Sequence, residues 1–140
     1  MSTVKIFTLG HLHEWNDANL PEGMYVENVP QADFTFNLDR ILRDPAHVPT
    51  GELLNMTGED DEVQAFVRAT EGYESLLDNI FGLVRDVVWR GKDVVIYVLC
   101  AGGKHRSVAA AIDLAWALEE WEIEVQVTHL HKHLDRVIKK

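Results

Sequence analysis

The chain of 140 residues has one cysteine, four prolines and no long hydrophobic run. Because Cys100 has no second cysteine to pair with, a disulfide-stabilised secreted scaffold is excluded and a reducing compartment is favoured. The longest apolar run, 94–101, is far shorter than the roughly 18 residues that a membrane span needs. The first residues lack the apolar core of a secretory signal. We therefore expect a cytoplasmic protein with no membrane partner.

Basic side chains are also scarce, with 13 against 23 acidic ones, which gives a net charge of −10. An acidic chain is a poor general binder of nucleic-acid backbones. The segment 129–140 is the exception, since its four basic residues face only one acid. If RNA binds, we expect it to meet this basic C-terminal tail through Lys132, Arg136, Lys139 and Lys140. A solvated tail without a partner is the alternative.

The composition is that of one globular domain, 1–140, because 46% of the residues are hydrophobic and 26% are charged. Hydrophobic periodicity predicts strands at 3–9, 32–38, 93–100 and 123–128, and a short one at 24–26. Helices are predicted just after Gly58, at 73–89 and at 106–120, with a long loop over 43–58. This order predicts a single α/β domain with a short, partly parallel sheet and helices packed on both faces.

The most informative segment is Cys100-Ala-Gly-Gly-Lys-His-Arg-Ser107, which joins the strand 93–100 to the helix 106–120. Open α/β sheets bind their ligands at such junctions. Glycine backbone and a helix N-terminus offer N–H groups and positive potential, and an arginine can hold an oxyanion with two bonds. We therefore predict a phosphate-type anion site formed by Gly102, Gly103, Lys104, His105, Arg106 and Ser107. The alternative is a helix start whose glycines serve packing alone.

The same segment also resembles the signature loop of cysteine-dependent phosphatases, in which a thiolate attacks phosphorus. Cys100 is followed by five residues, Arg106 and Ser107, but Leu99 stands where that family usually has histidine. No aspartate can be assigned as the general acid, although four lie in suitable loops: Asp39, Asp44, Asp60 and Asp61. We favour a non-catalytic protein with a buried Cys100 and keep a phosphatase as the alternative. Walker A and G-x-G-x-x-G motifs are absent, which disfavours ATP hydrolysis and dinucleotide binding.

Histidines gather near both ends of the chain. His129, His131 and His133 alternate and would share one face if the last strand continued, with His11 and His13 as further ligands. No acid or cysteine pattern completes a site, so we expect no metal and no cofactor. The tryptophans lack the basic neighbours of a base-stacking platform. We expect two of them, Trp116 and Trp121, in the core or at an interface.

The segment 100–109 resembles the Cys-Thr-Gly-Gly-x-His-Arg-Ser-Val stretch of the RapZ C-terminal domain family. Further segments agree in order and bring the resemblance to about residues 3–130: Thr8-Leu-Gly10, Ala32-Asp-Phe-Thr-Phe36 with Arg40 and Pro45, Leu54–Asp60, and Val125-Gln-Val-Thr-His129. The chain departs from the family at Leu12, where the family has lysine, and at Leu130-His131, where it has Arg-Asp.

The resemblance implies a free-standing module of a family that binds a regulatory small RNA and the amino-sugar phosphate glucosamine-6-phosphate, and that self-associates. Phosphate binding carries over best, through Gly102, Gly103, His105, Arg106 and Ser107, whereas RNA binding carries over weakly to so acidic a chain. We therefore expect an adapter that binds a phosphorylated small molecule or RNA, acts through a protein partner and forms a homo-oligomer. A structural interaction subunit with an empty loop is the third hypothesis.

Overall fold

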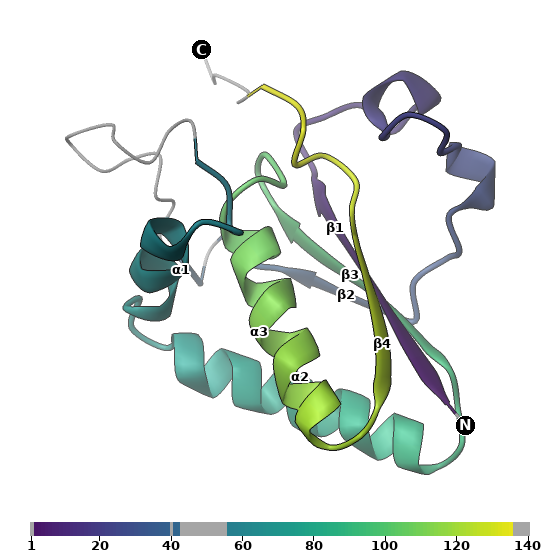
Figure 1. The fold of residues 1–140 in the computed structure, drawn as a ribbon, viewed down its shortest axis with the longest axis vertical. Coiled ribbons are helices and arrows are strands. Elements are labelled where there is room, and N and C mark those ends of the chain that lie inside the picture. Colours follow the sequence, from purple (N-terminus) through teal and green to yellow (C-terminus); the bar gives the residue numbers. More distant parts are fainter. Residues whose placement is uncertain (1, 40, 43–55, 136–140) are drawn as a thin grey trace.

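A computed structural model describes residues 2–39, 41–42 and 56–135 (Figure 1). Within these ranges the chain forms four strands, three α-helices and two short 3-10 helices. In chain order they are β1 (Thr3–Gly10), η1 (Asp17–Asn19), η2 (Val26–Asn28), β2 (Phe34–Asn37), α1 (Asp61–Arg68), α2 (Tyr73–Trp89), β3 (Val94–Cys100), α3 (Arg106–Glu120) and β4 (Glu124–His129). None of the described helices is long and apolar enough to cross a membrane.

The strands form one sheet in the order β2-β3-β1-β4, and every neighbouring pair is parallel. The predicted α/β class is confirmed, and the sheet is parallel throughout. Gly10 pairs with Cys100, Thr8 pairs with His129, and Asn37 pairs with Leu99. The carboxyl ends of all four strands therefore meet at one edge of the sheet, where open α/β sheets bind ligands.

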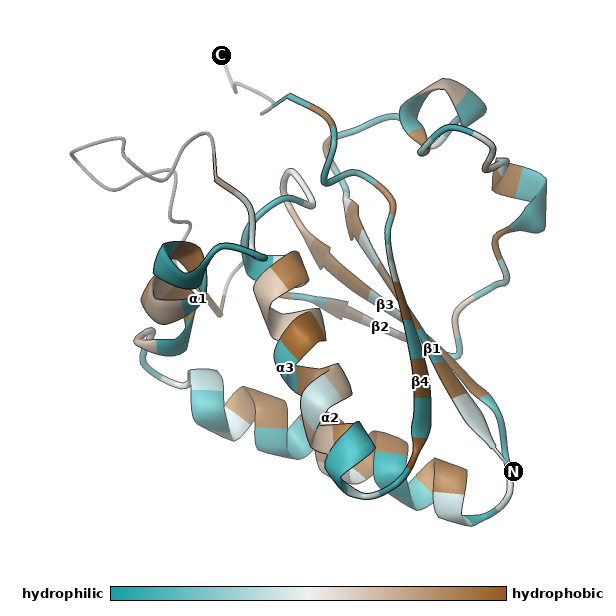
Figure 2. Cartoon of the chain, viewed as in Figure 1, coloured by the Kyte–Doolittle hydropathy of each residue, from teal (hydrophilic) through white to brown (hydrophobic). Residues whose placement is uncertain are grey.

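The three α-helices cover one face of the sheet, and an irregular segment with two short 3-10 helices covers the other. On one face the side chains of Val4, Ile6 and Ile96 are fully buried beneath α1, α2 and α3. On the other face the irregular segment 11–32, with η1 and η2, packs over Phe7 and its neighbours. Figure 1 shows the two coverings, and Figure 2 shows hydrophobic stripes along the α-helices beside hydrophilic ones. This pattern is expected of helices with one face on a sheet.

The short strand predicted at 24–26 is wrong. Val26 begins the 3-10 helix η2, and its backbone N–H donates to the Asp17 carboxylate at 2.8 Å. The apolar side chains Met24, Val26 and Val29 pack on the sheet face without pairing as a strand. Their hydrophobic spacing therefore reflects a segment that covers the sheet.

Asp113 of α3 ties the three α-helices together. Its carboxylate accepts two bonds from Arg68 of α1, at 2.9 and 2.6 Å, and one from the Tyr73 hydroxyl of α2 at 2.6 Å. Burial of the hydroxyl and its bond to Asp113 raise the pKa of Tyr73 well above its usual range. The network fixes how α1 and α2 lie against α3.

We expect Asp113→Ala to lower the free energy of unfolding by about 2 kcal/mol, because a half-buried hydroxyl and a guanidinium lose their acceptor. Urea unfolding followed by circular dichroism measures the change. Asp78→Ala, on an exposed position of α2, is the control and should stay within about 0.5 kcal/mol. Equal stability of the two variants would mean that the network contributes nothing.

Candidate functional site

The segment between β3 and α3, residues 101–105 (the glycine loop), lies at the carboxyl edge of the sheet in backbone contact with the end of β1. A Cβ on Gly10 would lie 2.3 Å from the carbonyl carbon of Gly102, and a Cβ on Gly103 would lie 2.4 Å from the nitrogen of Gly10. Gly103 also has a φ of +68°, a left-handed backbone conformation that residues with a Cβ atom rarely adopt. The close contact between the end of β1 and the glycine loop therefore requires glycine at both positions.

The glycine loop presents backbone donors that the fold does not use. In the described part of the chain, the N–H groups of Gly102, Gly103 and Lys104 donate to no protein acceptor. The N-terminus of α3 follows directly at Arg106 and adds the positive end of the helix dipole. Unused amides beside a helix N-terminus are suited to an oxyanion.

The side chain of Arg106 is buried and already has partners. Its guanidinium lies 3.2 Å from the Asp39 carboxylate and donates to the carbonyl oxygens of Asp39 and Leu42 at 3.3 Å. Asp39 also bonds His11, so these side chains connect the ends of β1 and β2 to the start of α3. The structure therefore gives Arg106 a positioning contact at the end of β2, and Asp39 offsets part of its charge.

Cys100 and Ser107 lie beneath the glycine loop. Cys100 is 2% exposed, Ser107 is fully buried, and the thiol donates to the Ser107 hydroxyl at 3.2 Å. A nucleophilic cysteine needs an accessible thiolate beside a cationic group. Arg106 is bonded to Asp39 instead, so this geometry does not favour Cys100 as a nucleophile.

The histidines that alternate near the end of the chain do not share one face, because β4 ends at His129, and they have different hydrogen-bond partners. The Nδ1 atom of His129 bonds the Thr8 hydroxyl at 2.7 Å, whereas the buried ring of His131 accepts the Gly10 N–H at 2.9 Å. His133 is exposed. Among the residues that the structure describes, no group of three or more histidine, cysteine or acidic side chains is arranged to hold a metal ion.

Burial lowers the pKa of three histidines at this edge, His13, His129 and His131. Burial, together with smaller effects of the nearby rings of His13 and His133, lowers the pKa of His131 to about 4. The pKa values of His13 and His129 are also lowered by burial. The rings of His13 and His131 meet edge to face with centroids 5.0 Å apart. These histidines therefore contribute shape and hydrogen bonds at neutral pH, but little charge.

The remaining residues that were predicted to bind a ligand lie in two places, the glycine loop and the C-terminal tail. His105 is buried at the start of α3, while Lys104 is half-buried and accepts the Gly58 N–H through its carbonyl at 2.8 Å. In the basic tail, Lys132 pairs with Glu59 at 2.6 Å. Three further tail residues lie outside the described residues: Arg136, Lys139 and Lys140.

Two residues at this edge were not assigned their present roles from the sequence. Gly10 entered only as the last residue of the segment Thr8-Leu-Gly10 of the resemblance, and Asp39 only as a candidate acid. Both positions carried a signal, because each lies at the carboxyl end of a strand or just beyond it. Residues at such positions meet at one edge whenever the strands are parallel.

Comparison with known proteins gives a consistent result. The model of the RapZ C-terminal domain matches residues 23–133. A nucleotide-binding protein of Thermobifida fusca is 36% identical over 118 residues, which are 80% of this chain and 39% of that protein. One of Corynebacterium diphtheriae is 40% identical over 96 residues, 64% of this chain and 31% of that protein. One of Fervidobacterium nodosum is 32% identical over 103 residues, 70% and 36% respectively.

The chain thus spans between about a third and two fifths of these relatives. The family match covers β2, β3, the glycine loop, the three α-helices and β4. It therefore includes most of the carboxyl edge described above, but it begins after β1 and Gly10. The chain belongs to the RapZ C-terminal domain family.

Proposed function

We propose that the protein binds a small phosphorylated ligand through the glycine loop and acts as a non-catalytic adapter module in the cytoplasm. The observation that carries this proposal is the set of N–H groups at Gly102, Gly103 and Lys104, which have no acceptor among the described residues and lie beside the N-terminus of α3. Phosphate is the biological oxyanion that such loops bind most often. The printed names of the relatives, nucleotide-binding proteins, support ligands of the same phosphate chemistry.

Each part of the loop has a role in this proposal. The backbone amides bind the phosphate oxygens, and Arg106 supplies positive potential from below while holding the β2 end in place. Lys104 and His105 adjust the affinity, and Ser107 supports the loop through its bond with Cys100. An amino-sugar phosphate is the ligand that the family resemblance suggests. A protein partner and a homo-oligomer complete the adapter hypothesis.

A small ligand is favoured over RNA by the charge of the edge. Asp39 and Glu59 lie there, and Glu59 already neutralises Lys132. With a net charge of −10, the chain repels a polyanion more strongly than a single phosphate. If RNA does bind through the tail, truncation after Leu130 should abolish binding, and the affinity should fall steeply with salt.

Isothermal titration with glucosamine-6-phosphate, and with glucosamine as the control without phosphate, tests the proposal. We expect binding of the phosphate ester only. Arg106→Ala should weaken it roughly ten- to a hundredfold, since a bond or close interaction with a charged group contributes about 1.5–3 kcal/mol. Arg106→Lys should restore part of the loss, because lysine keeps the charge but not the planar fork.

Cys100→Ser should leave the affinity nearly unchanged. Circular dichroism must show that each variant is folded, and Lys104→Gln, on a half-buried loop residue, provides a milder second variant with an expected few-fold loss. Equal affinity of wild type, Arg106→Ala and Lys104→Gln would exclude the glycine loop as the binding site. Hydrolysis of an aryl phosphate that disappears in Cys100→Ser would instead support the phosphatase.

A further inference from the structure

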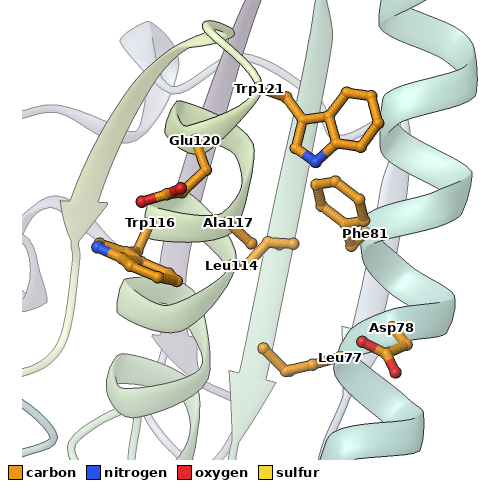
Figure 3. A pocket seen from close by; sticks show the side chains of 8 residues that line it. All are labelled: Leu77, Asp78, Phe81, Leu114, Trp116, Ala117, Glu120 and Trp121. Atoms are coloured by element: carbon orange, nitrogen blue, oxygen red, sulfur yellow. The ribbon is translucent and has the colours of Figure 1, made fainter.

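A groove between α2 and α3 lies at the end of α3 farther from the glycine loop (Figure 3). Its volume is about 320 Å³. Apolar side chains from both helices and two tryptophans line it: Leu77, Phe81, Leu114, Ala117, Trp116 and Trp121. The groove is therefore large enough to take one apolar side chain of a second molecule, and it is separate from the proposed phosphate site.

The sequence predicted that Trp116 and Trp121 lie in the core or at an interface. The structure excludes the core for both. Trp116 is 67% exposed and Trp121 is 49% exposed, because the positions of α3 that face the sheet are filled by residues such as Leu114 and Leu118. Trp89 at the end of α2 is 60% exposed, and its ring lies tilted by 54° against that of Trp121, with the ring centres 5.2 Å apart. Exposed aromatic side chains gathered on one part of a surface mark interaction sites, where tryptophan is enriched.

The charged residues at the rim of the groove are acidic. Asp78 of α2 and Glu120 of α3 line it, and no basic side chain does so among the residues that the structure describes. Two more exposed acids stand near this end of α3, Glu119 in its last turn and Glu122 just beyond it, where the helix dipole adds negative potential. This electrostatic environment repels nucleic acid and acidic peptides, and it attracts cations.

The molecule itself shows how a guanidinium binds beside this groove. The guanidinium carbon of Arg85 lies 5.5 Å from the ring centre of Phe81, 5.2 Å from that of Trp89 and 5.4 Å from that of Trp121. These distances are those of cation–π contacts. The outer ring, Trp116, has no such cation in the described structure and stands next to Glu120.

We propose that this groove docks a segment of another protein in which arginine or lysine stands beside a large apolar side chain. The apolar side chain fills the space between Leu77, Phe81 and Leu114, and the cation lies between Trp116 and Glu120. A basic partner also suits a chain with a net charge of −10, whereas two copies of this acidic face repel each other. The site thereby gives the module a protein-binding surface that does not depend on the glycine loop.

Selection of random 12-residue peptides displayed on phage against the full chain tests the proposal. We expect enrichment of peptides that combine arginine or lysine with a neighbouring aromatic or branched apolar residue. Trp116→Ser and Glu120→Lys should each weaken the best peptide about tenfold or more, as loss of an interface hot spot does. Glu22→Lys makes the same charge change at an exposed position of the segment 11–32 and should alter the affinity less than about twofold.

Nuclear magnetic resonance of the indole N–H groups locates the peptide, since the four tryptophans give separate signals. The signals of Trp116 and Trp121 should shift, and that of Trp15 should not. The proposal is overturned if no peptides are enriched, if the selected peptides are acidic, or if both groove variants bind as wild type does. A concentration-dependent dimer abolished by Glu120→Lys, or RNA binding abolished by Trp116→Ser, would assign the face to a second copy or to RNA instead.

Discussion

Gly10→Ala is expected to lower the free energy of unfolding by about 3 kcal/mol or more, an effect as large as that of a severe core substitution. The added Cβ would lie 2.3 to 2.7 Å from backbone atoms of Gly102 and Gly103. Backbone atoms cannot move aside as a flexible side chain can, so the glycine loop or the end of β1 must shift. Urea unfolding of the two proteins measures the difference.

Gly102→Ala is the matched control in the same loop. A Cβ on Gly102 would meet no atom within 4 Å, and its backbone is not in the left-handed region. We expect this variant to keep wild-type stability or to gain a few tenths of a kcal/mol from a less flexible unfolded chain. Similar losses of stability in both variants would show that the close contact of Gly10 with the glycine loop is not the cause.

The second large effect is a dependence of stability on pH between about 4 and 6.5. Burial lowers the pKa of His131 to about 4 in the folded protein, against about 6.5 for an unfolded histidine. Below pH 6.5 the unfolded chain therefore binds a proton that the folded protein does not. Stability is complete above pH 6.5 and decreases as the pH falls towards 4. Between pH 7 and pH 5 we expect a loss of about 2 kcal/mol from this residue alone.

His131→Asn separates this titration from the other groups, because the asparagine carbonyl can still accept the Gly10 N–H that now donates to Nδ1. The variant should lose most of the slope between pH 7 and pH 5. A smaller slope remains from His13 and His129, whose pKa values are lowered for the same reason. An unchanged slope in His131→Asn would show that His131 titrates near its ordinary pKa.

Both effects act on the same backbone. Gly10 contacts the glycine loop on one side and donates to His131 on the other. Protonation of His131 on Nδ1 removes that acceptor and places a charge beside His13. If the glycine loop binds phosphate as proposed, its affinity and the stability of this edge should decline together in acid.

The helices and strands could be predicted from the sequence, because each depends on periodicity within a short window. The helix 73–89 and the helix 106–120 begin and end at the predicted residues, and β3 begins one residue later than expected. The apolar run in 93–100 indicated a strand buried on both faces, and both faces of β3 are covered. Among the predictions that fall on described residues, the short strand at 24–26 failed, because its hydrophobic spacing came from packing on the sheet. Most of the predicted loop 43–58 lies outside the described residues.

The position of the candidate site was also suggested by the sequence, because a glycine-rich junction between a buried strand and a helix is a local feature. What the side chains do there was not. Arg106 is 67 positions from Asp39, yet the parallel order β2-β3-β1 brings the ends of these strands together and pairs the two residues. The alternation of His129 and His131 suggested one face, but β4 ends between them.

The sequence by itself therefore determined the elements, the α/β class and the glycine loop between β3 and α3, since these follow from periodicity, turn residues and chain order. Only the tertiary structure decided which charges are neutralised and which aromatic side chains remain exposed. Asp39 forms an ion pair with Arg106, and the Gly10 N–H donates to the ring of His131. Trp116 of α3 remains exposed to solvent. These outcomes depend on contacts between residues far apart in the chain, which no local pattern encodes.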